Sequence, residues 1–294
     1  MNEALLSQCR YLHDLRLWTH VPTPRVERWL GNFLPDELPF AEALLEAFIY
    51  LNDQMIDRLF ASAFHNLSGG DLGSGASYAS RQAEWQRFRG DVHITHVTGE
   101  EPNSSDSGYA FARRARMSLL VDQSHIFPPD EALRQQLVAG PTPLIFVDDF
   151  AGSGNQLLDT WTREVVVGTV RRSFAATAQA GVLGPVFYCL PVITSYALER
   201  LAVHAPDVSV RAAHVLSANY GAGHPDSLLF PAALLADKDG FLRQVTARAF
   251  GPNEDPLGFH GLGLALAFEY GPPDATLPIV WKEHRSWTAL VPRR

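Results

Sequence analysis

The sequence predicts an α/β fold in which a mainly parallel sheet is flanked by helices and preceded by a helical N-terminal extension. Three observations predict it. Apolar residues recur at helical spacing near the N-terminus, strand and helix patterns alternate from residue 92 to residue 216, and Pro143 to Val147 is a short, continuously apolar run. Such a run is typical of a central parallel strand that is buried on both faces.

Residues 1–67 have a helical pattern. Between Ala41 and Phe64 the apolar residues fall close to a helical period, at Leu44, Phe48, Leu51, Met55 and Leu59. The pair Asn52-Asp53 can divide this stretch into two helices with a cap between them. We therefore expect a helical extension over residues 1–67.

Residues 68–80 are rich in Gly and Ser, so we expect residues 68–90 to form a flexible connection followed by a short helix. The alternating pattern occupies residues 91–294, the expected main domain. Its predicted helices include Tyr109–Leu120 and Tyr196–His204, and its predicted strands are Val92–Val97, Pro143–Val147, Val186–Ile193, Val208–Leu216, Leu262–Phe268 and Leu277–Trp281.

Composition and net charge limit the classes of ligand and the cellular location that the protein can have. The formal net charge is −8, which argues against direct binding of nucleic acid phosphates. Only Lys238 and Lys282 are lysines, so an anion would be bound by arginines or by backbone N–H groups. The two cysteines cannot build a disulfide framework. We find no run long enough for a membrane span and no signal peptide, and we expect a cytoplasmic protein without membrane contact.

One segment combines acids with a loop of small residues. The apolar run ends in Asp148-Asp149, and Ala151-Gly152-Ser153-Gly154 leads into the start of a helix. Ligands of open parallel sheets bind beyond the carboxyl ends of the strands. Small residues let backbone N–H groups approach an anion, and a helix N-terminus favours phosphate. Ribose 5-phosphate would satisfy both parts, because its hydroxyls suit the acids and its phosphate suits the loop.

This arrangement resembles the phosphoribosyltransferase signature of four apolar residues, two acids and a short loop with Thr/Ser-Gly. The resemblance implies a type I phosphoribosyltransferase-like fold in which Asp148 and Asp149 hold the ribose hydroxyls of phosphoribosyl pyrophosphate. It also implies a 5-phosphate loop of Ala151, Gly152, Ser153, Gly154, Asn155 and Gln156. The signature has Thr where Gln156 stands, so one hydroxyl donor is lost.

The likeness extends to a narrower group. The segment from Phe146 to Gln156, the C-terminal stretches Asp274–Trp281 and Trp287–Pro292, and the N-terminal Ala43–Leu51 look like the phosphoribosyltransferase-like domain associated with bacterial conflict systems. Membership would imply a role in anti-phage defence.

A phosphoribosyltransferase also needs a loop for pyrophosphate after an earlier strand. Asp106, Ser107 and Gly108 follow the predicted strand Val92–Val97 in the right order. The alternative is an ordinary turn in which Asp106 caps the next helix. We expect Mg²⁺ to offset the charge of the leaving pyrophosphate, with Asp148 and Asp149 as indirect metal contacts.

Two other functions remain open. The chain could be a catalytically degenerate nucleotide sensor that regulates a partner protein through residues 1–67. It could also be an S-adenosylmethionine-dependent methyltransferase, since Asp148 to Gly154 resembles the first motif of those enzymes. Their second motif is not matched by Phe127-Pro128-Pro129-Asp130 or by Gly271-Pro272-Pro273-Asp274. We expect binding of phosphoribosyl pyrophosphate or a nucleotide, with transfer or cleavage at the anomeric carbon.

Overall fold

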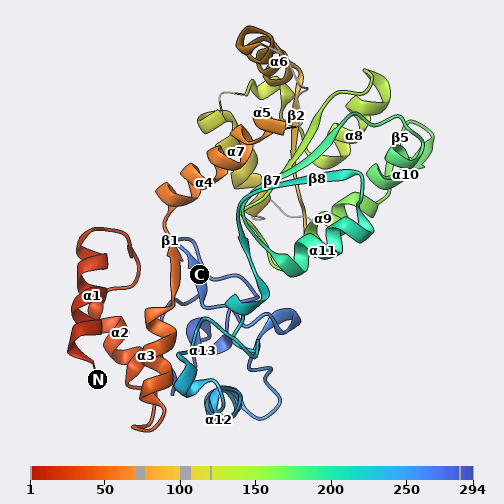
Figure 1. Ribbon diagram of the computed structural model, residues 1–294. Helices are drawn as coiled ribbons and strands as arrows, with labels where there is room; N and C mark the ends of the chain where they lie inside the picture. Colours follow the sequence, from red (N-terminus) through yellow and green to blue (C-terminus); the bar gives the residue numbers. More distant parts are fainter. Residues whose placement is uncertain (1, 71–76, 100–106, 120, 285, 294) are drawn as a thin grey trace. The chain divides into compact units, whose positions relative to one another are not determined.

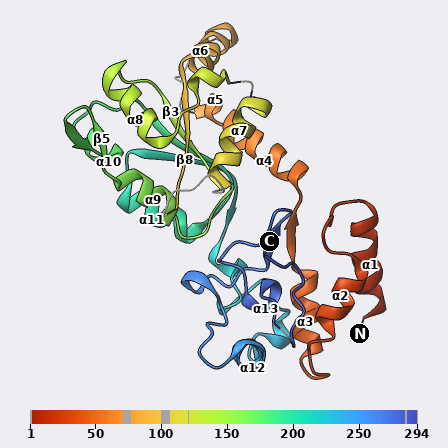
Figure 2. The ribbon, with the colours of Figure 1, turned by 180° about the vertical axis from the view of Figure 1, so that it is seen from behind.

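The computed structural model describes residues 2–70, 77–99, 107–119, 121–284 and 286–293. The chain forms two compact units, drawn from opposite sides in Figures 1 and 2. The sheet unit runs from Ile56 to Val215, and the terminal unit combines Met1–Met55 with Leu216–Arg294.

A mainly parallel sheet forms the centre of the sheet unit. Its order is β2-β3-β7-β4, and β8 also pairs with β7. The pairs β2/β3, β3/β7 and β4/β7 are parallel, which confirms the predicted fold class. The strands are β2 (His93–His96), β3 (Leu144–Val147), β4 (Phe150–Ala151), β7 (Val186–Thr194) and β8 (Val208–Leu216).

Helices pack on both faces of this sheet (Figures 1 and 2). Successive strand residues point to opposite faces: Phe146 contacts Trp161 and Phe174 on one face, and Phe187 contacts Phe88 on the other. The helices are α4 (Asp53–His65), α5 (Leu67–Gly70), α6 (Tyr78–Asp91), α7 (Ser107–Leu119), α8 (Pro129–Val138), α9 (Asn155–Thr162), α10 (Phe174–Gln179) and α11 (Ser195–His204). A hairpin of β5 (Val165–Val167) and β6 (Val170–Arg172) joins α9 to α10.

The terminal unit brings the two ends of the chain together. Strand β1 (Ile49–Leu51) pairs in parallel with β9 (Leu266–Phe268), and the indole N–H of buried Trp29 donates to the carbonyl of Ile279 at 2.8 Å. The helices are α1 (Glu3–Asp14), α2 (Thr23–Leu30), α3 (Leu38–Glu46), α12 (Lys238–Phe250) and α13 (Pro278–Trp281).

Three element predictions need correction. Residues Ile49–Leu51, expected to be helical, form β1 because they pair with the distant β9. Residues Leu277–Trp281, expected to be a strand, contain helix α13, whose first turn accepts Pro278 because proline needs no N–H there. Only Leu266–Phe268 of the predicted strand Leu262–Phe268 is a strand. The predicted cap is confirmed: Asn52 Oδ1 accepts from the N–H of Met55 at 2.9 Å.

The two units do not coincide with the segments 1–67, 68–90 and 91–294 expected from the sequence. Residues 1–55 belong with residues 216–294, and residues 56–67 belong with the sheet. Within the Gly/Ser-rich stretch, α5 ends at Gly70 and α6 begins at Tyr78, while residues 71–76 lie outside the described residues. In the part of the chain described here, no helix is both long and apolar enough to cross a membrane.

Candidate functional site

The acidic pair interrupts a strand in the middle of the sheet. β3 pairs with β7 up to Val147 opposite Cys189, and pairing resumes in the same register at Phe150 opposite Val192. This register places Asp149 opposite Pro191, which has no N–H to donate. The two acids therefore occupy a gap in the β3–β4 line, at the carboxyl end of β3, as the sequence predicts.

Asp148 points into the protein. Its side chain is 1% exposed. Its Oδ2 accepts a 2.7 Å hydrogen bond from the hydroxyl of Tyr188, and its Oδ1 accepts a 2.9 Å bond from the N–H of Asp149. Burial, followed by the neighbouring charge of Asp149, raises the pKa of Asp148 well above its usual range. Asp148 is thus a buried acid that stays protonated to unusually high pH.

Asp149 is the more accessible acid, with 9% exposure. Its carboxyl lies close to that of Asp148, because both its charge and a side-chain hydrogen bond between the two acids raise the pKa of Asp148. The hydrogen bond from its N–H to Asp148 fixes its backbone. Of the two acids, Asp149 is therefore the less buried, and the ribose contact of both stays a prediction.

Side chains of α11 and of its N-cap residue, Thr194, donate hydrogen bonds to carbonyl groups of the small-residue loop. The hydroxyl of Thr194 donates to the carbonyl of Gly152 at 2.6 Å. The guanidinium of Arg200 donates to the carbonyl of Ser153 at 2.5 Å and to Oδ1 of Asn155 at 2.7 Å. Both carbonyl groups therefore already accept hydrogen bonds from side chains of the protein.

The N–H groups of the same loop are available to a ligand. Gly154 precedes α9 with a φ of +76°. The first N–H groups of a helix have no acceptor within the helix. The N–H of Asn155 donates to Ser153 Oγ at 3.3 Å. Those of Gly152, Ser153, Gly154 and Gln156 donate to no acceptor among the described residues. Converging donors at a helix N-terminus are suited to phosphate.

The end of the neighbouring strand β2 is fixed beside α9. The N–H of Thr98 donates to Thr160 Oγ1 at 2.9 Å, and Arg163 donates to the hydroxyl of Thr98 and, at 2.6 Å, to the carbonyl of Gly99. Parallel strands β2 and β3 end at the same edge of the sheet, so the chain leaves β2 close to the acidic pair.

The predicted pyrophosphate loop is described only in part. Asp106 lies outside the described residues. Ser107 and Gly108 form the start of α7, which begins at Ser107, and this placement fits the capped-turn alternative as well as the pyrophosphate loop. The role of these three residues stays a prediction.

An indirect magnesium role for the described residues stays a prediction. They contain no cluster of three or more His, Cys, Asp or Glu side chains that could hold a metal ion. Both oxygens of Asp148 already accept hydrogen bonds. Magnesium at this edge would therefore be held largely by phosphate oxygens and water, as is usual for that ion, with Asp149 as the nearest carboxylate.

The sequence analysis missed five residues of this site. Tyr188 could have been found from the sequence, because a tyrosine hydroxyl within the apolar run of β7 needs a buried hydrogen-bond partner. Thr194, Arg200, Thr98 and Arg163 act through backbone carbonyls or a single hydroxyl, and no motif marks them.

Comparison with known proteins agrees with this geometry. The model of the PRTase-CE family matches residues 26–293, nearly the whole chain. A search of curated proteins finds no match. Since the matched region contains both the interrupted strand with its acids and the loop at the start of α9, the chain belongs to the PRTase-CE family, a phosphoribosyltransferase-like family.

Proposed function

We propose that the sheet unit binds phosphoribosyl pyrophosphate, or another ligand that carries ribose 5-phosphate. The observation that carries the proposal is the set of N–H groups of Gly152, Ser153, Gly154 and Gln156, which have no acceptor among the described residues. A phosphate supplies several acceptors at once, and the ribose hydroxyls supply donors for the carboxylate of Asp149.

The chemistry follows from this placement. The lone pair of an acceptor forms a new bond to the anomeric carbon, while the bond to pyrophosphate breaks and its electrons leave with the pyrophosphate. The sugar carbon becomes electron-poor, and the carboxylate of Asp149 stabilises that charge. Magnesium, when bound, supplies positive charge for the pyrophosphate. Asp148 and Tyr188 are positioning residues, since they act through Asp149.

Calorimetric titration tests the ligand. We expect phosphoribosyl pyrophosphate with Mg²⁺ to bind, and Asp149→Asn to weaken binding by about tenfold or more, the equivalent of one charged hydrogen bond. Asp207→Asn is the matched control, because Asp207 is exposed on the same unit. Unaltered binding by Asp149→Asn would remove the ribose assignment. Binding of S-adenosylmethionine instead would make the protein a methyltransferase.

A pyrophosphate-release assay separates an enzyme from a sensor. An enzyme releases pyrophosphate when candidate acceptors are added, whereas a sensor binds the ligand without turnover. Because Gln156 stands where the signature has Thr, the assay must distinguish an active enzyme from a sensor that binds without turnover. The measurement is pyrophosphate release over time, with Asp149→Asn as the inactive reference.

We further propose that the protein is an effector in anti-phage defence that contacts a partner through residues 1–67. The resemblance of the central and terminal motifs supports the first part. Exposed apolar side chains support the second, since Tyr11 is 62% exposed and Leu34 is 51% exposed. Phage plaque counts test both. We expect Asp149→Asn to lose protection, and Tyr11→Ser with Leu34→Ser to lose it while ligand binding is retained. Protection by all variants would reject the roles of Asp149 and of the exposed apolar residues, and absence of protection by the wild type would reject the defence role.

A further inference from the structure

Helix α9 begins at the phosphate loop and ends beside the backbone that follows β2. Its last turn contains Thr160, and Arg163 is its C-cap residue. Both side chains contact Thr98. Thr98 leaves β2 next to the acidic pair, because the N–H of Val97 still donates to the carbonyl of Val147 at 3.3 Å. One helix therefore contacts both loops that flank the acids.

The peptide group between Thr98 and Gly99 is oriented by this helix. Thr160 Oγ1 accepts from the N–H of Thr98 at 2.9 Å and donates to the carbonyl of Thr98 at 3.3 Å. A trans peptide group directs its carbonyl and its N–H to opposite sides, and the described residues contain no cis peptide bond. The N–H of Gly99 therefore points away from Thr160.

The N–H of Gly99 is open to a ligand. It has no acceptor among the described residues, and a Cβ added at Gly99 would meet nothing within 4 Å. The carbonyl of Gly99 is bound, because NH2 of Arg163 donates to it at 2.6 Å while NH1 donates to the hydroxyl of Thr98. A backbone donor that faces open space beside a bound carbonyl is suited to an anionic acceptor.

Arg163 also brings a positive charge to this backbone. It forms no ion pair with a described carboxylate, since its two contacts are with a hydroxyl and a carbonyl. Arg200 is bound in the same way at the phosphate loop, to a carbonyl and an amide oxygen. The acidic pair would repel an anionic ligand, and the charges of these two arginines offset that repulsion at both loops.

We propose that α9 couples the two ends of a phosphoribosyl pyrophosphate site, an inference that rests on the proposed function. The 5-phosphate binds at the first turn of the helix. Thr160 and Arg163 are positioning residues at its other end, where they turn the N–H of Gly99 towards the pyrophosphate group. This N–H donates to a pyrophosphate oxygen, a contact that ribose 5-phosphate alone does not make.

Two ligands that differ in the pyrophosphate group test the coupling. The full chain is titrated with ribose 5-phosphate and, separately, with phosphoribosyl pyrophosphate and Mg²⁺. We expect Arg163→Met to weaken binding of the second ligand by about tenfold and to leave binding of the first unchanged. Arg163→Lys keeps the charge and loses the fork, so it should recover part of the lost affinity.

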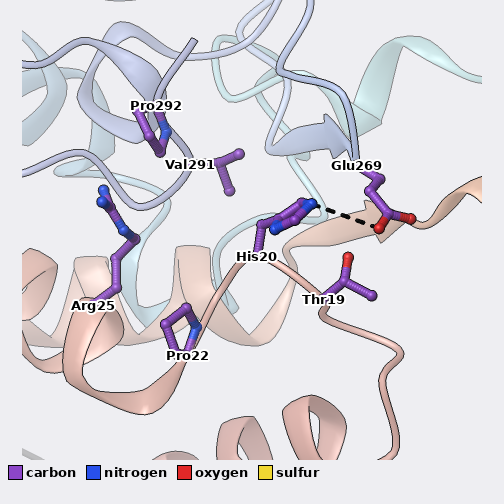
Figure 3. Close-up of a pocket in the computed structure, with 7 residues that line it drawn as sticks. All are labelled: Thr19, His20, Pro22, Arg25, Glu269, Val291 and Pro292. Atoms are coloured by element: carbon purple, nitrogen blue, oxygen red, sulfur yellow. Dashed lines mark ion pairs between the residues drawn. The ribbon is translucent and has the colours of Figure 1, made fainter. Parts of the chain in front are cut away.

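Arg25→Met is the matched control. Arg25 lines a hollow of the terminal unit (Figure 3). Like Arg163, it donates to a side-chain oxygen, that of Glu283, and to a backbone carbonyl, that of Ala289, both at 3.1 Å. We expect the Arg25 variant to bind both ligands as the wild type does.

Substitutions of Gly99 test the N–H itself. Gly99→Pro deletes this donor, whereas Gly99→Ala keeps it and places a methyl group in open space. We expect Gly99→Pro to bind phosphoribosyl pyrophosphate about tenfold more weakly and Gly99→Ala to bind it normally. Circular dichroism checks that each variant is folded, and where Arg163→Met does not fold, the comparison of the two Gly99 variants decides.

The outcomes separate this inference from the proposed function. If the wild type binds neither ligand, both fail. If the wild type binds ribose 5-phosphate, the proposed ribose-phosphate site stands, and three results overturn the coupling alone. These are phosphoribosyl pyrophosphate binding no more tightly than ribose 5-phosphate, folded Arg163→Met and Gly99→Pro binding it as the wild type does, or the same variants losing both ligands to the same extent.

Discussion

The hydroxyl of Tyr188 donates a 2.7 Å hydrogen bond to Oδ2 of Asp148, deep between β7 and the interrupted strand β3. The other oxygen of Asp148 accepts from the N–H of Asp149. This relationship makes two adjacent acids unequal. Asp148 is fixed inside the protein, and Asp149 extends from a backbone that Asp148 holds in place.

The inequality predicts different outcomes for the two acids. We expect Asp149→Asn to reduce ligand binding with little effect on the free energy of unfolding. Asp148→Ala should lower the free energy of unfolding by about 1–3 kcal/mol, because it leaves the buried hydroxyl of Tyr188 without its acceptor. Urea unfolding and calorimetric titration measure the two effects. Equal losses of stability in both variants would contradict the assignment.

Removal of the Tyr188 hydroxyl should lower the affinity for the ligand indirectly, through the position of Asp149. Tyr188→Phe deletes one hydrogen bond to Asp148 and keeps the ring, so we expect a stability loss of about 1–2 kcal/mol and weaker ligand binding. Tyr188→Leu also creates a cavity and should cost more. Titration of Tyr188→Phe with phosphoribosyl pyrophosphate checks the positioning role, which is wrong if the variant is destabilised but binds as the wild type does.

The raised pKa of Asp148 predicts a pH dependence of stability. Burial and the charge of Asp149 raise this pKa in the folded state above that of the unfolded chain. The folded state therefore binds the proton more tightly, and its advantage is present at low pH. That advantage is lost as pH rises from about 4 through the raised pKa. Asp148→Asn, which cannot ionise, should show a smaller fall in unfolding free energy over this window. Urea unfolding at several pH values compares the two slopes, and identical slopes would exclude Asp148 as the source.

The sheet could be predicted because its signals are local. The run ending at Val147 is apolar at every position, and a strand buried on both faces requires that pattern. The strand β1 could not be predicted in the same way. Residues Ile49–Leu51 continue a helical spacing, and their strand geometry depends on pairing with Leu266–Phe268 at the far end of the sequence.

The candidate site likewise contains residues that a local motif predicts and residues that only the fold brings to it. Asp148, Asp149 and the loop from Ala151 to Gln156 are contiguous in sequence, so a motif reveals them. Arg200 reaches that loop from α11, 47 residues after Ser153, and its target is a backbone carbonyl, which any residue would offer. The unequal burial of the two acids also depends on contacts outside the motif, such as the hydrogen bond from Tyr188 to Asp148.

The glycine before α9 should tolerate no side chain. Gly154 has a φ of +76°, and a Cβ there would lie 3.2 Å from Cδ2 of Leu201. Gly181 has a similar φ of +70° but would meet nothing within 4 Å, which makes it a matched control. Both alanine variants incur the backbone strain of about 1–2 kcal/mol, and Gly154→Ala should lose more stability and bind phosphate ligands more weakly. Thermal unfolding and titration compare them, and equal behaviour would show that contact with Leu201 is unimportant.

Arg200 should control affinity through the shape of the phosphate loop. It binds the carbonyl of Ser153 and the side chain of Asn155 while its guanidinium lies over the ring of Tyr196. In Arg200→Met these two anchors are lost, the loop samples more conformations, and its N–H groups no longer converge before the ligand arrives. The entropy of ordering the loop then opposes binding, so we expect affinity for phosphoribosyl pyrophosphate to fall by about tenfold. Arg134→Met, which removes a contact with Glu131 on α8, is the surface control. A fall in affinity confined to Arg200→Met would establish that the bound carbonyls keep the loop's N–H groups turned towards the phosphate.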